Sequence, residues 1–67
     1  RRMNEELKLL KRCDDLKARH RELDDQIRSL SASALNEMLV MRLKKEKLRL
    51  RDEIILLEQQ IYPDIIA

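Results

Sequence analysis

The sequence predicts an all-α protein, specifically an antiparallel two-helix coiled-coil hairpin, and two hairpins are expected to assemble into a four-helix bundle. Three observations support this fold class. Leucine recurs every seven residues through two long segments, which is the spacing of a coiled-coil seam. Glycine is absent, and the single proline lies near the end of the 67 residues. The heptad pattern also changes phase near the middle of the chain, which indicates a turn.

The composition excludes a sheet protein of this size. Phe, Trp and Gly are absent and valine occurs once, at Val40, whereas strands and their turns need β-branched or aromatic residues and glycine. Hydrophobic residues make up 43% and charged residues 42% of the chain, a balance typical of long helices. A chain of 67 residues has room for one domain, so we interpret residues 1–67 as a single hairpin.

The first helix is predicted at about 4–30, where two rows of seam residues alternate at steps of three and four. The leucine row consists of Leu9, Leu16, Leu23 and Leu30, and the second row consists of Cys13, His20 and Ile27. Cys13 is therefore expected to pack as a small hydrophobic residue and not to act as a reactive thiol.

The second helix is predicted at about 35–61 by the same pattern. Its rows are Leu43, Leu50 and Leu57 on one side and Val40, Lys47, Ile54 and Ile61 on the other. Pro63 is expected to end this helix, because the residue before a proline is disfavoured in the α region. The remaining tail, residues 63–67, is apolar enough that we expect it to fold against a helix or a neighbouring chain.

The two heptad patterns differ in phase by one residue. The first register, continued, places a seam residue at Met41, whereas the second places it at Val40. The intervening Ser31 and Ser33 favour turns and helix caps over helix interiors. We therefore predict a turn at about 31–36, and either serine is a candidate cap for the second helix. The alternative is one continuous helix through this segment.

Charge and cysteine content restrict the function classes. The formal net charge of +2 points to no particular partner, and a single Cys excludes an internal disulfide and a thiolate zinc site. No apolar run approaches the roughly 20 residues that cross a bilayer, and the start lacks the apolar segment of a signal peptide. A cytoplasmic protein without a membrane span is the expectation.

Two sequence motifs carry a family resemblance. Residues 20–27 read H-x-x-L-D-x-x-I, and residues 43–54 read L-K-K-E-K-L-R-L-R-D-E-I. In this order they resemble the signature motifs of the YdcH-like family of small bacterial proteins of unknown function, over residues 16 to 57, with Arg51 in place of the usual lysine. The resemblance implies a bacterial, cytoplasmic helical hairpin and lends no catalytic residue.

The residues of these two motifs have a chemical and a structural interpretation. His20 and Asp24 share a helix face and could form a metal or acid–base pair, but no second histidine or ligand cluster accompanies them. In an antiparallel hairpin they lie opposite Lys44 and Lys47, so we favour contacts within the hairpin. The residues of the two motifs that we predict to contact one another within the hairpin, called the signature contacts, are His20, Leu23, Asp24, Ile27, Leu43, Lys44, Lys47 and Leu50.

A basic stretch at 42–51 contains six cations and one acid, Glu46. Its candidate anion-binding residues are Arg42, Lys45, Arg49 and Arg51. A nucleic-acid or regulatory RNA-associated factor is therefore the alternative function. Against it, the stretch has no aromatic residue for base stacking.

A third heptad row of the second helix lies about 100° round the helix from the Val40 row. It consists of Met41, Leu48, Ile55 and Tyr62. One partner helix cannot cover both rows, so we predict that this row is an oligomer interface. The leading hypothesis is a non-enzymatic protein–protein interaction module without metal or cofactor, which forms a homodimer or higher homo-oligomer and binds a protein partner of unknown identity.

Overall fold

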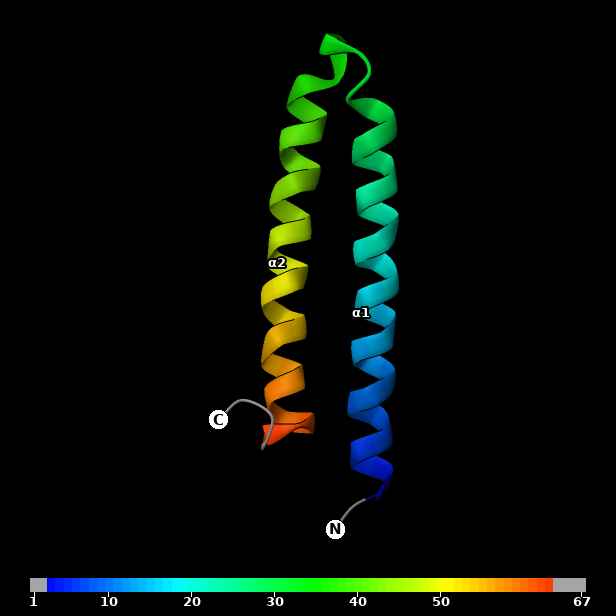
Figure 1. Cartoon of the computed structure of the whole chain (residues 1–67), viewed down its shortest axis with the longest axis vertical. Helices are drawn as coiled ribbons and strands as arrows, with labels where there is room; N and C mark the ends of the chain where they lie inside the picture. The colour runs from blue at the N-terminus through cyan, green and yellow to red at the C-terminus, as the bar shows by residue number, and fades with distance from the viewer. Residues whose placement is uncertain (1–2, 64–67) are drawn as a thin grey trace.

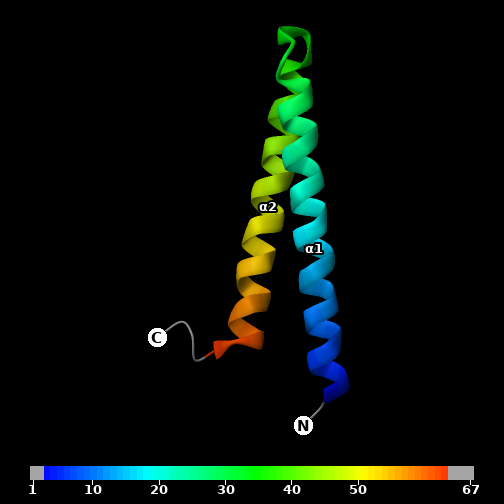
Figure 2. The same ribbon diagram turned by 45° about the vertical axis from the view of Figure 1, so that its right-hand side comes forward.

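Two long antiparallel helices make up the protein in a computed structural model that describes residues 3–63 (Figure 1). Helix α1 spans Met3–Leu30, a 3-10 turn η1 spans Ala34–Asn36, and helix α2 spans Glu37–Ile61. The predicted antiparallel hairpin is confirmed, and the alternative of one continuous helix is wrong. The turn lies at one end of the hairpin, and the start of α1 and the end of α2 lie at the other. The axes are slightly inclined to each other (Figure 2).

The turn is formed by an extended residue followed by a short 3-10 helix. Ser33 leaves the helical region, with φ −125° and ψ 132°. Its hydroxyl oxygen accepts a hydrogen bond from the backbone N–H of Leu35 at 3.2 Å. This serine therefore caps η1 and not an α-helix, and α2 begins at Glu37 instead of at about 35 as the spacing suggested.

Asn36 ties the turn back to the end of α1. Its side-chain amide donates to the carbonyl oxygen of Leu30 at 3.0 Å, and the backbone N–H of Ser33 donates to the same oxygen at 3.3 Å. A carbonyl that the end of the helix would leave without an intrahelical partner is thereby satisfied. No residue in the described range 3–63 has a positive φ, which explains how the chain turns without glycine.

The core is a narrow seam between the two helices. Its buried side chains are Cys13, Leu16, Leu23, Ile27 and Val40, and Leu23 is the one described side chain with no exposed surface. The other seam residues of α2, from Leu43 to Ile61, are only half-buried. The heptad rows therefore identify the residues that face inward, but a single pair of helices covers most of them incompletely.

Helix α2 ends where the proline requires it to end. Tyr62 leaves the helical region, with φ −127° and ψ 64°, while its N–H still donates to the carbonyl oxygen of Glu58 at 2.8 Å. Pro63 follows and is exposed. The predicted packing of the apolar tail falls mainly on residues 64–67, which lie outside the described residues. Neither described helix combines the length and hydropathy that a membrane-spanning segment needs.

Candidate interaction surface

The two signature motifs meet across the hairpin at an ion pair. Lys47 projects from the seam of α2, and its Nζ donates to Asp24 Oδ1 of α1 at 2.5 Å. His20 lies one helical turn before Asp24, with its Nδ1 3.9 Å from Asp24 Oδ2, a pair that is ionic only when the imidazole is protonated. The structure places Lys44 on the exposed surface, in no ion pair among the described residues. The remaining apolar signature residues, Leu23, Ile27, Leu43 and Leu50, line the seam.

The pairing affects the titration of Asp24. The hydrogen bond from Lys47 lowers the pKa of the Asp24 carboxyl below its ordinary value of 3.8, and the positive charge of Lys47 adds to this effect. Partial desolvation opposes both. Because the pKa is lower in the folded chain, the pair stabilises the hairpin above the unfolded pKa. That stabilisation is lost as the pH falls through the folded pKa.

A double-mutant cycle tests this pair. We expect Asp24→Ala and Lys47→Met to be non-additive in the free energy of unfolding at neutral pH, because each variant removes the same hydrogen-bonded contact. The coupling should disappear in acid, as the pH falls well below 3.8 and Asp24 becomes protonated. Urea unfolding of the two single variants, the double variant and the unmodified chain gives the coupling directly.

Lys11 and Asp15 provide the matched control. They form an exposed pair within α1 at 3.1 Å, with 76% and 59% of their side chains exposed. The same substitutions there, Lys11→Met and Asp15→Ala, should give a smaller coupling, because exposed pairs are screened by water. Equal coupling in the two cycles would contradict a special role for the Asp24–Lys47 contact.

Three further ion pairs join the helices along the edges of the seam. Their partners are Arg12 and Glu53 at 2.8 Å, Lys17 and Glu58 at 2.9 Å, and Arg19 and Glu46 at 3.3 Å. The contact with Glu58 raises the pKa of Lys17 above 10.5. Each pair is too exposed to add much stability. Together, however, they favour one register of the antiparallel pair.

The sequence-based prediction did not include these three pairs. The available signal was the position of their charged residues beside the heptad rows. Which residue faces which depends on the length of the turn, and the heptad rows alone do not determine this length. The structure resolves the register through Ser33 and η1.

The basic stretch 42–51 divides into one paired cation and five unpaired ones. Lys47 is bound to Asp24. Among residues 3–63, no ion pair is made by Arg42, Lys44, Lys45, Arg49 or Arg51. All five are exposed. Their spacing distributes them over the two flanks and the outer side of α2, so they do not converge on one point.

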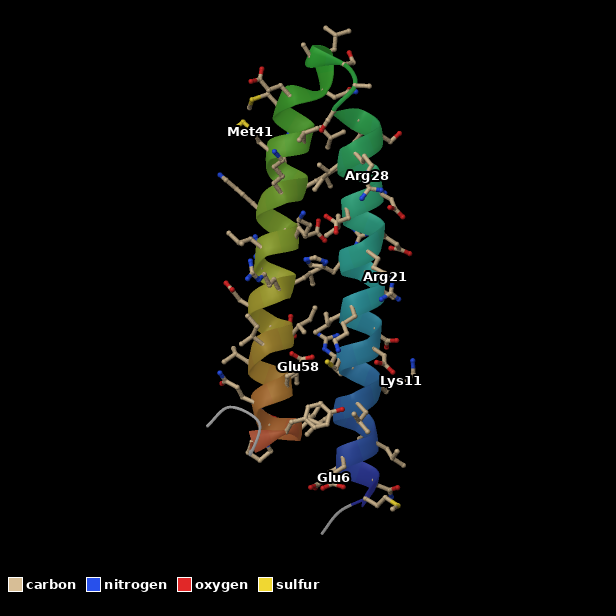
Figure 3. All side chains as sticks on the ribbon, viewed as in Figure 1. Glu6, Lys11, Arg21, Arg28, Met41 and Glu58 are labelled. Carbon is tan, nitrogen blue, oxygen red and sulfur yellow. The ribbon has the colours of Figure 1, made fainter. Side chains whose placement is uncertain are left out.

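The apolar row of α2 remains uncovered in the single hairpin. The exposed fractions are 51% for Met41, 57% for Leu48, 42% for Ile55 and 45% for Tyr62. Figure 3 shows Met41 projecting from the side of α2 that faces away from α1. Leu56, next to Ile55, is also exposed. This outer row, defined as Met41, Leu48, Ile55 and Tyr62, extends along most of the helix. Tyr62 lies just past the end of α2 and also lines a groove with Leu9 and Leu10 of α1.

The outer side of α1 is charged, in contrast to the apolar outer row of α2. Lys11 and Arg21 project there, away from α2 (Figure 3). Acidic residues lie among them and form ion pairs within the helix, such as Arg28 with Asp25 at 3.1 Å. The apolar surface of the hairpin is therefore concentrated on one of its two helices.

Two grooves lie on the surface of the described hairpin, and neither gathers a set of metal ligands. A groove of about 300 Å³ is lined by Lys17, His20, Arg21, Arg51 and Ile54, and one of about 260 Å³ lies near Leu9 and Tyr62 at the helix ends. Within the described range, no three His, Cys, Asp or Glu side chains gather as a metal site. Cys13, the single cysteine, is buried in the seam.

Comparison with known proteins supports the resemblance seen in the two motifs. Residues 14–58, which are most of the chain and include the turn and the larger part of each helix, match one family. A search of the curated proteins and a search of the solved structures each gave no match. The resemblance to the YdcH-like family is confirmed. The chain belongs to the family described as "Protein of unknown function (DUF465)", which includes the YdcH-like small proteins.

Proposed function

We propose that this chain is a non-enzymatic protein–protein interaction module that self-associates through the outer face of α2. The outer row carries the proposal: three large apolar side chains at heptad spacing on one side of α2, Met41, Leu48 and Ile55, are 42% to 57% exposed. Tyr62, 45% exposed, follows them just past the end of the helix. Scattered exposed apolar residues are common on proteins, but a contiguous apolar stripe marks an interface. Heptad spacing fits a partner helix that lies along α2.

The small core supports the same proposal. Five described hydrophobic side chains are buried, and only Leu23 is without exposed surface. A chain of 67 residues without disulfide or metal needs further buried area to offset the entropy of ordering. A second copy supplies that area in the simplest way, because a twofold axis places the same row on itself. The product would be a four-helix bundle.

The test is the concentration dependence of thermal stability. If folding and association are coupled, the melting temperature should rise with chain concentration over about a hundredfold range. Circular dichroism at 222 nm measures the helix content during melting. A melting temperature that does not change over this range would contradict self-association.

A second candidate function rests on the five unpaired cations of the basic stretch. Arg42, Lys44, Lys45, Arg49 and Arg51 are exposed and make no ion pair among the described residues. Such cations suit contacts with a phosphate backbone. Binding of labelled single-stranded RNA should then weaken steeply with salt, and Arg42→Gln with Arg49→Gln should reduce the salt slope by about 1.4. Absence of binding at low salt would contradict this candidate.

A further inference from the structure

Charge is distributed unequally along the hairpin. The closed end, defined as residues 17–51 and containing the turn, has ten basic and five acidic residues. The open end, defined as residues 3–16 and 52–63, has three basic and seven acidic residues. Ion pairs within the hairpin do not remove this asymmetry, because most of them join residues of the same end. The described hairpin therefore has a positive closed end and a negative open end.

The outer row is centred on the boundary between the two ends. Its middle lies between Leu48 and Ile55, and the charge changes sign between Arg51 and Asp52. A twofold axis through this point, perpendicular to α2, therefore does two things at once. It places the outer row of one copy on that of the other, and it brings each positive end against a negative end.

We propose that a second copy docks antiparallel on the outer row, α2 against α2, with the twofold axis between Leu48 and Ile55. This inference rests on the proposed self-association and adds the orientation and register of the partner. Leu48 then packs on Ile55 of the second copy, and Met41 lies level with the end of α2 of the second copy, next to Tyr62. Lys44 is level with Glu58 of the second copy, which already pairs with Lys17 of its own chain at 2.9 Å.

A parallel arrangement would use the same row at an electrostatic disadvantage. It would place two positive closed ends side by side, including Lys44 and Lys45 of both copies flanking the row. Like charges along a helix pair disfavour it, and charge complementarity commonly determines orientation in coiled coils. The charge distribution therefore selects the antiparallel partner.

Disulfide trapping tests the orientation. Each variant carries Cys13→Ala, so the introduced cysteine is the only one. In the antiparallel register, Asp52 lies beside the axis, so Asp52→Cys should crosslink to itself nearly completely under mild oxidation. Lys45→Cys should not, because two copies of residue 45 lie about 20 Å apart along the helices, beyond disulfide reach.

A mixed sample provides the positive control for Lys45→Cys. Residues 45 and 59 share one flank of the outer row and become level across the antiparallel pair. Mixing Lys45→Cys with Gln59→Cys should therefore give the mixed disulfide, although neither variant crosslinks with itself. Circular dichroism checks that each variant retains the helix content of the Cys13→Ala chain.

The possible outcomes separate this inference from the proposed function. Self-crosslinking of Met41→Cys would show a parallel pair, because Met41 of the outer row meets its own copy only in that arrangement. This result would overturn the orientation and leave self-association intact. A dimer by sedimentation that fails to crosslink at Asp52 would overturn the register. A monomer by sedimentation, without crosslinks, would overturn both proposals.

Discussion

Replacing Leu48 and Ile55 together by glutamate is expected to convert the assembly into monomers and to lower its helix stability. The two side chains are 57% and 42% exposed in the single hairpin and would become buried between two copies. Burying two carboxylates without partners costs several kcal/mol, so the dissociation constant should rise by more than about 100-fold. Size-exclusion chromatography with light scattering measures the mass, and circular dichroism measures the remaining helix content.

The matched control is the pair Leu7→Glu and Leu35→Glu. It makes the same chemical change at two other exposed leucines, with 55% and 95% of their surface accessible. Neither belongs to the outer row, so the control should leave the mass unchanged. A loss of association in both double variants would mean that added negative charge causes the effect. The specific role of the outer row would then be contradicted.

Replacing Leu23 by alanine is expected to cause the largest loss of stability from a single substitution. Leu23 has no exposed surface and lies in the middle of the seam, and removing a buried leucine side chain costs about 2–5 kcal/mol. Small domains have little more than this in total. Most molecules of the variant should therefore be unfolded at room temperature, and the helical signal should be lost accordingly. Urea or thermal unfolding followed by circular dichroism provides the measurement.

Leu35→Ala provides the comparison for Leu23→Ala. Leu35 lies in η1 with 95% of its surface exposed, so its truncation should change the free energy of unfolding by less than about 0.5 kcal/mol. Similar losses in the two variants would indicate that the seam does not determine stability as the structure implies.

The heptad pattern predicted the fold and the inward-facing residues because a coiled-coil seam is encoded locally. Each residue's face follows from its position in the repeat, so residues such as Leu16, Leu23 and Val40 were identifiable without coordinates. The phase change likewise placed the turn. The start of α2 was less predictable, because a 3-10 turn and a helical turn both suit residues 34–36.

The contacts between helices depended on information that the pattern lacks. The Asp24–Lys47 pairing followed from the approximate register, since a seam lysine needs a carboxylate nearby. The pairs that Arg12 and Arg19 form with α2 could not be predicted in this way, because a shift of a few residues in the register changes their partners. The pattern also shows that the outer row exceeds what one helix can cover. It does not identify what covers the row.

The most direct test of the central claim is the mass of the chain in solution by sedimentation equilibrium. One chain has a mass of 8.1 kDa. If the outer row of α2 is a self-association surface, the folded species at micromolar concentration should have twice this mass or a higher multiple. On dilution the measured mass should fall toward that of one chain, and helix content should fall with it. A fully helical species with the mass of one chain at all concentrations would contradict the claim.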